Sequence, residues 1–187
     1  MNPPPKRKLP SPRAADATRG AAVFMVALLV LATPLRPTVA ADGAGMPSPP
    51  HGQSAADPRA SFPRSALEIR SGQGRQWFTI RIADTPERQE LGLMLLRTLP
   101  SDEGMLFPQA RPQLVYMWMK NTLIPLDMLF IDSRGRIACL REQATPLSLD
   151  IITCEAPVKA VLEIGGGEAA KRGIAVGDRV LHALFGS

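Results

Sequence analysis

The sequence has few of the side chains on which metal binding and nucleophilic catalysis usually depend. Its 187 residues include two histidines, His51 and His182, and two cysteines, Cys139 and Cys154. A structural zinc site takes four closely spaced Cys or His ligands. A Ser-His-Asp triad would have to use His182, which lies in an apolar stretch near the C-terminus. No loop has the ligand spacing of an EF-hand. We therefore expect no metal site and no cofactor.

Residues 65–187 lack a surplus of either charge. The whole chain has 22 Lys and Arg against 17 Asp and Glu, and the surplus of five lies in residues 1–64, which hold eight basic and three acidic side chains. The remaining fourteen basic and fourteen acidic side chains balance one another. Because proteins that bind nucleic acids attract the phosphate backbone with a positive field, we do not expect a nucleic acid as a partner.

No apolar run is long enough to span a bilayer comfortably. The most apolar stretch, residues 21–32, has 12 residues, whereas a transmembrane helix takes about 20. It follows a basic segment and precedes Pro34, Pro37 and the small-residue sequence TVAAD, a pattern typical of an export signal. We expect residues 1–41 to be a signal peptide and the protein to be periplasmic or secreted. The alternative is an uncleaved N-terminal anchor facing the periplasm, which would be the one contact with a membrane.

The rest of the chain divides into a linker and a domain. Residues 42–64 are rich in Pro, Gly and Ala without a hydrophobic period, which predicts a flexible tether. Period-two alternation and turn residues predict strands over 67–69, 77–82, 102–107, 114–119, 126–131, 136–141, 158–164 and 179–184. Helices are predicted from Asp84 to Leu95 or Leu96, with Gly92 inside, and over 168–172. We expect residues 65–187 to form one mainly β (β-rich α+β) domain, an antiparallel sandwich or open barrel with two short helices.

The stretch YMWMKNTLIPLD places Lys120 at the end of an apolar run. If the predicted strands over 114–119 and 126–131 pair as a hairpin, Lys120 faces Asp127 directly across the ladder. In one interpretation this pair fixes the register of the hairpin, and Asn121 shapes its turn. In the other, the three side chains point into a pocket and bind a polar ligand.

Three functions are compatible with this hairpin mouth. We predict a domain that binds a small polar ligand or an envelope protein. One alternative is an enzyme that acts on a polar envelope metabolite or glycan with Lys120 and Asp127 as acid and base. The other is a structural or assembly factor with no ligand site. Tyr116 and Trp118 are assigned to the core. Further candidate ligand-binding side chains are Arg88, Arg97 and Glu142.

The two cysteines lie in the part of the chain that we expect to be exported. In an oxidising compartment Cys139 and Cys154 can form a disulfide. The alternative is that both are small buried apolar side chains. Their spacing does not match the C-x-x-C motif of thioredoxin-like redox proteins.

Several motifs are shared with one family. They are Gly92-Leu93-Met94, Arg97, Gly104-Met105-Leu106-Phe107, the long stretch from Trp118 to Asp132, Glu142, Pro146, Val161-Leu162-Glu163, Gly173 and Gly177-Asp178. From about Phe78 to Leu184 the chain resembles the domain of unknown function 192 family, also called uncharacterised protein family 0127. The resemblance implies a compact, mainly β, jelly-roll-like domain, often behind an export signal in bacteria, and it implies no established activity. The two cysteines are not family features.

Overall fold

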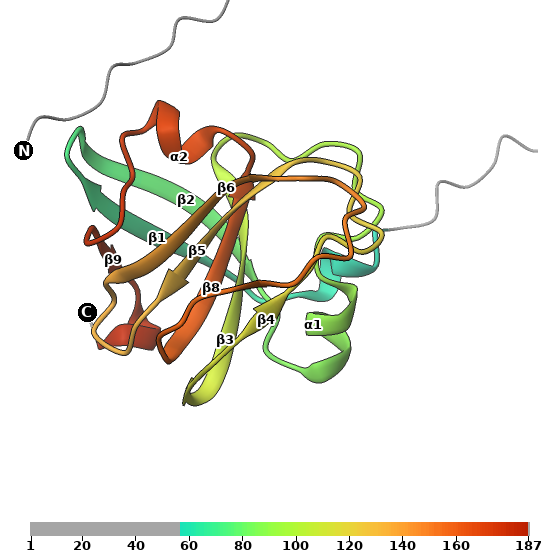
Figure 1. Ribbon diagram of the computed structural model, residues 1–187, viewed down its shortest axis with the longest axis horizontal. Helices are drawn as coiled ribbons and strands as arrows, with labels where there is room; N and C mark the ends of the chain where they lie inside the picture. Colours follow the sequence, from blue (N-terminus) through green and yellow to red (C-terminus); the bar gives the residue numbers. More distant parts are fainter. Residues whose placement is uncertain (1–56, 187) are drawn as a thin grey trace, which may run out of the picture. The chain divides into compact units, whose positions relative to one another are not determined.

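Short segments, some with period-two alternation and others buried on both faces, form a curled sheet of seven strands in the computed structural model, which describes residues 57–186 (Figure 1). The strands are β1 (Arg64–Ser71), β2 (Gly74–Ile82), β3 (Glu103–Gln113), β5 (Leu126–Ile131), β6 (Ile137–Ala144), β8 (Val158–Gly165) and β9 (Arg179–Leu181). Their spatial order is β6-β5-β8-β3-β2-β1-β9. A separate two-stranded ribbon consists of β4 (Tyr116–Met117) and β7 (Ile152–Thr153).

Two short α-helices accompany the sheet. They are α1 (Pro86–Leu91) and α2 (Glu168–Lys171), and two 3₁₀ turns, η1 (Pro58–Ser61) and η2 (Ala183–Phe185), lie at the ends of the described chain. All pairs within the large sheet are antiparallel except β2 and β3, which are parallel and are connected through α1. A bridge between Arg136 and Arg179 joins the two edges of the sheet at one end, so that it curls into a half-barrel. The expected β-rich α+β class is confirmed.

The two faces of the sheet bury two separate apolar clusters. One cluster takes side chains from all seven strands, among them Leu67, Phe78 and Leu162, and is closed by Ala169 of α2. The other lies against the opposite face of β3, β5 and β8 and is covered by Leu93 and by the segments that carry β4 and β7. The candidate site lies on this second face, because the segments that cover it leave part of it open.

Tight strand packing explains the glycine of the GMLF motif. A Cβ atom at Gly104 would lie 2.7 Å from the backbone carbonyl oxygen of Glu163 on the neighbouring strand β8. No side chain fits in that space without displacing the backbone of β8. Gly104 therefore keeps β3 and β8 at normal ladder distance.

The first helix is shorter than predicted. It ends at Leu91, because Gly92 takes a backbone φ of 45° and stops the helix instead of lying within it. The N-cap is Thr85, whose Oγ1 accepts a hydrogen bond from the backbone nitrogen of Arg88, and not the predicted Asp84. The segment after Gly92 then turns back over the sheet.

The prediction of a central strand over 114–119 is wrong. The extended part is limited to Tyr116 and Met117, which pair with β7 rather than with β5. Tyr116 and Trp118 are 63% and 49% exposed and so do not belong to the core, whereas Met119 is fully buried. Apolar side chains in this segment therefore occur both where it packs into the core and where it is only partly covered.

The folded part begins before the predicted boundary at Ser65. The sequence predicts that residues 57–64 belong to the tether, yet Arg59 is buried and its Nε donates a 2.6 Å hydrogen bond to the carbonyl of Gly92. The predicted signal peptide and the tether up to residue 56 lie outside the described residues. Within residues 57–186 there is no helix with the length and hydropathy required to cross a bilayer.

A disulfide links Cys139 of β6 to Cys154, which directly follows β7, with 5.8 Å between their Cα atoms. Because β7 pairs with β4, this bond ties the small ribbon to the edge of the large sheet. The Oγ1 of Thr153 adds a 2.8 Å hydrogen bond to the carbonyl of Val115. The segment over the second apolar face is thus held at its β7 end.

Candidate functional site

Asp127 is a structural carboxylate and does not face Lys120. It is fully buried in β5, opposite Ile164 of β8. Its Oδ1 accepts hydrogen bonds from the backbone nitrogens of Gln143 at 2.8 Å and Gly167 at 3.0 Å, and its Oδ2 accepts one from Ala169 at 2.8 Å. The carboxylate therefore binds a bulge in β6 and the first turn of α2, where free backbone N–H groups favour an anion.

Lys120 lies in an exposed turn after β4. Its ammonium group is 5.4 Å from the centre of the Trp118 ring, a cation–π contact, and within residues 57–186 it forms no ion pair. The predicted Lys120–Asp127 pair is therefore wrong, because β4 and β5 are not neighbours in any sheet. An acid–base pair of these two residues has no geometric basis.

The other predicted site residues are dispersed. Asn121 is exposed and has a positive φ of 57°, and its carbonyl accepts a 2.8 Å hydrogen bond from Leu95. Arg88 of α1 forms an ion pair with Asp84, which precedes the helix. Arg97 is exposed between α1 and β3, and Glu142 is exposed on β6 beside a small hollow of about 210 Å³. These side chains do not converge on one ligand position.

A larger cleft opens over the second apolar face. It has a volume of about 560 Å³ and lies between the C-terminal end of α1, the second half of β3 and the segment that carries β4. Its lining is partly apolar and aromatic and partly polar, and consists of residues 89–94, Phe107, Gln109, Gln113, residues 114–118, Lys120, Thr122 and Glu163. Of the predicted candidates, Lys120 alone lines it.

Glu163 is the polar group on the floor of this cleft. It lies in β8 between Met105 of β3 and Met128 of β5, and its side chain is 4% exposed. Within residues 57–186, no side chain or backbone group donates a hydrogen bond to this carboxyl group, and no cation pairs with it. Burial in these apolar surroundings raises the pKa of Glu163 to about 8. A carboxyl group without protein partners thus lines the cleft.

The rim of the cleft is aromatic. Tyr116 and Trp118, two positions apart along the chain, both line the cleft and remain substantially exposed. Aromatic side chains at the mouth and one unpartnered acid at the base form an arrangement found in small-molecule sites, where apolar walls hold a ligand and few polar groups orient it.

Sequence reasoning did not identify Glu163 as a site residue. The signal was present in VKAVLEIG, where an acid occupies the same side of an apolar strand as the buried Val161. Lone acids in buried strands reduce stability unless they are paired, so they are candidates for function.

The described residues 57–186 contain no group of three or more His, Cys, Asp or Glu side chains that could act as ligands of a metal ion.

Comparison with known proteins agrees with the fold. A crystal structure of a putative transcription regulator from Sinorhizobium meliloti 1021 is 39% identical, with a TM-score of 0.64, over 66% of this chain and 97% of that one. A protein of unknown function from Novosphingobium aromaticivorans DSM 12444 is 33% identical, with a TM-score of 0.65, over 71% of this chain and 94% of that one. None of the curated proteins matches the chain. The family model DUF192, described as an uncharacterized ACR, matches residues 67–182, and the chain therefore belongs to the DUF192 family.

Proposed function

We propose that this protein is an exported binding domain that holds a small molecule in the cleft above Glu163. The observation that carries the proposal is the carboxyl group of Glu163, which is buried at the base of the cleft without a partner among the described residues. Burying an unpaired acid lowers stability. A fold that keeps such a group where a ligand can reach it is best explained by binding.

The size and lining of the cleft support the same conclusion. Its volume of about 560 Å³ lies within the range of ligand sites, roughly 300 to 1,000 Å³. The walls combine Phe107, Val115 and Met117 with a few polar groups, which suits a ligand with an apolar body and one polar end. Export rests on the signal peptide predicted for residues 1–41.

The description as a putative transcription regulator belongs to the Sinorhizobium protein. The balanced charge of residues 65–187 gives no reason to extend nucleic-acid binding to this chain. The aromatic rim and the buried acid instead favour a small molecule.

Native mass spectrometry of protein purified from its own cells tests the proposal. Met117 is half-buried and lines the cleft, so Met117→Trp fills part of the volume, and Leu149→Trp is the matched control on an exposed residue that does not line it. We expect a small-molecule mass on the wild type and on Leu149→Trp, and its loss from Met117→Trp, with thermal unfolding to verify that both variants fold. Equal bound mass in all three, or none in the wild type, would refute the proposal.

A further inference from the structure

Each glutamine side-chain amide that lines the cleft already donates a hydrogen bond within the protein. The side-chain amides of Gln89, Gln109 and Gln113 donate to the carbonyl of Pro108, the carbonyl of Phe107 and the side-chain oxygen of Gln109, at 3.0, 3.4 and 2.7 Å. None of these bonds reaches Glu163. A molecule that satisfies this carboxyl group therefore has to bring its own donor.

The rim already holds a cation. The Lys120 ammonium lies 5.4 Å from the centre of the Trp118 ring, so that the face of the ring attracts a positive charge. Lys120 is exposed and forms no ion pair within the described part of the chain, so another cation can displace it without breaking a salt bridge. Tyr116 adds a second aromatic surface to the same rim.

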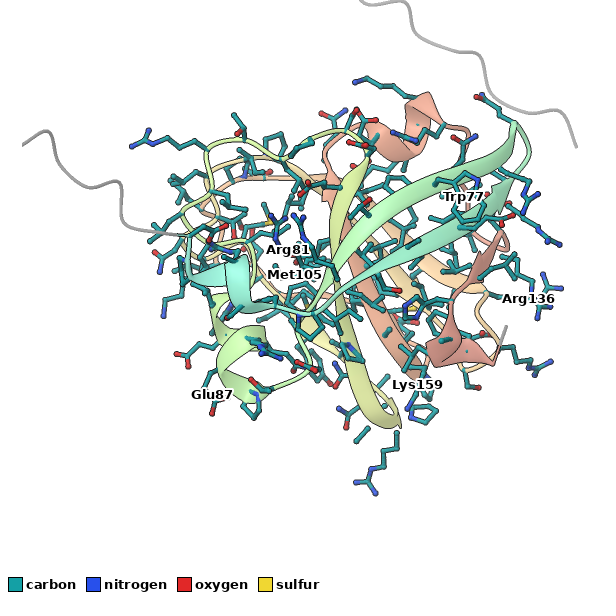
Figure 2. All side chains as sticks on the ribbon, turned by 180° about the vertical axis from the view of Figure 1, so that it is seen from behind. Trp77, Arg81, Glu87, Met105, Arg136 and Lys159 are labelled. Carbon is teal, nitrogen blue, oxygen red and sulfur yellow. A yellow bond between two sulfur atoms is a disulfide. The ribbon has the colours of Figure 1, made fainter. Side chains whose placement is uncertain are left out.

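The lining offers an anionic ligand no buried cation with which to pair. Glu90 lines the cleft at the end of α1, in addition to Glu163. Arg81 extends on the same side of the sheet, beside Met105 (Figure 2), but its guanidinium group forms an ion pair with Glu103 at 2.6 Å and does not line the cleft. Lys120 is the one cation of the lining, and it lies over Trp118 at the rim rather than against Glu163.

From this geometry we infer that the ligand is an amphipathic amine, whose protonated nitrogen pairs with the Glu163 carboxylate and whose apolar part lies against the aromatic rim of Tyr116 and Trp118. The inference rests on the proposed function and specifies its ligand class. A carboxylate paired with an ammonium group has the charge-assisted hydrogen bonds that the protein itself does not supply. The rings add apolar contact with the rest of the ligand.

Proton linkage distinguishes an amine from an alcohol or a sugar. Burial raises the pKa of Glu163 to about 8, so the group is largely protonated at pH 7. An ammonium group pairs with the ionised carboxylate, and its binding at pH 7 therefore displaces a proton. Below pH 8, affinity rises by up to about tenfold per pH unit, and above it affinity levels off. A neutral hydroxyl group binds the protonated acid and shows no such rise.

Calorimetry with n-hexylamine, n-hexanol and n-hexanoate at pH 6, 7 and 8 tests the inference. The three probes share one alkyl chain and differ in the head group. We expect hexylamine to bind at least tenfold more tightly than either partner at pH 8, to lose affinity towards pH 6 and to release a proton at pH 7. Glu163→Gln should abolish both this preference and the pH dependence, while Glu90, Tyr116, Lys120 and Arg81 remain in place.

Two further variants sharpen the result. Trp118→Ala should weaken hexylamine severalfold, because it removes part of the aromatic surface against which the alkyl chain packs. Lys120→Met should strengthen hexylamine a few fold, because it removes a positive charge of the cleft lining that repels the ammonium group of the ligand. If the ligand is anionic, Lys120→Met weakens hexanoate and hexylamine binds no better than hexanol, and the inference is overturned.

The outcomes separate the two proposals. If hexanol binds as tightly as hexylamine and neither affinity depends on pH, the assignment of an amine as the ligand is overturned. The proposed function of the cleft as a ligand site then still stands. Failure of all three probes to bind, together with no bound mass on the native protein, overturns both. Unchanged hexylamine binding in Glu163→Gln also overturns the amine assignment.

Discussion

The Asp127 Oδ2 atom lies 2.8 Å from the backbone nitrogen of Ala169, and this bond fastens β5 to the first turn of α2. The same carboxylate also accepts bonds from Gln143 and Gly167. We expect Asp127→Asn to lower the free energy of unfolding by about 2 to 4 kcal/mol, because an amide turns one donor group towards backbone donors. Urea denaturation measures this loss. Asp150→Asn, on an exposed acid, is the control and should change little.

Lys120 and Asp127 should behave as independent residues. The ammonium group of Lys120 contacts Trp118 in an exposed turn, whereas Asp127 is fully buried among backbone donors. A double-mutant cycle with Lys120→Ala and Asp127→Asn should give a coupling energy below about 0.5 kcal/mol, as for separate sites. A coupling of 1 kcal/mol or more would show that the two charges interact after all.

The sequence was a good guide to β2 and a poor one to β4, for a physical reason. In β2, Phe78, Ile80 and Ile82 alternate with polar residues because one face packs on the core. In the segment around β4, apolar residues serve both the core, through Met119, and the cleft rim, through Trp118. Both uses require apolar side chains, so hydrophobicity alone does not distinguish them.

The candidate site depended on contacts between segments far apart in the chain. The partners of Asp127 include Gly167 and Ala169, which follow it by 40 and 42 residues. Local hairpin reasoning offers Lys120 instead, since it is close in sequence. Glu163, in contrast, could have been noticed as a lone acid in an apolar strand, although the rest of the cleft lining comes from residues 89–94 and 107–122, which lie far from it in the chain.

Leu147 has an unfavourable backbone conformation on the surface. Its φ is 63° and its side chain is 57% exposed, while its backbone nitrogen bonds the carbonyl of Thr122. A left-handed conformation costs a leucine about 1 to 2 kcal/mol, and asparagine tolerates it better. Leu147→Asn should raise the free energy of unfolding by about 0.5 to 1 kcal/mol. Leu149→Asn, 68% exposed and without a positive φ, should not stabilise, and equal effects would exclude strain as the cause.

Reduction of the Cys139–Cys154 disulfide should destabilise the domain. The bond joins residues 15 positions apart, and a closed loop of that length contributes about 3 kcal/mol in the chain-entropy model. Because the bond ties the β4–β7 ribbon to β6, amide exchange at residues 116–118 should become faster after reduction. The double variant Cys139→Ala and Cys154→Ala should match the reduced protein and show no response to dithiothreitol. A reduced protein as stable as the oxidised one would contradict this prediction.

Glu163 should make the protein less stable as the pH rises. The pKa of its side chain is about 8 in the folded state against 4.5 for an unperturbed glutamate, so the unfolded state binds fewer protons between these values. The free energy of unfolding therefore falls from pH 4.5 to pH 8 by about 1.4 kcal/mol per pH unit from this group. Glu163→Gln lacks this slope, and we expect it to be more stable than the wild type by about 3 kcal/mol at pH 7 and similar to it near pH 4.5.

Urea denaturation across pH 4.5 to 8 measures the free energy of unfolding of the wild type and of Glu163→Gln as a function of pH. Glu90→Gln, which removes the other acid of the cleft lining, is the matched control. Parallel curves for the wild type and Glu163→Gln would mean that the buried carboxyl group is not held protonated, whereas a gain in stability without the acid would indicate that Glu163 serves binding at the expense of the fold.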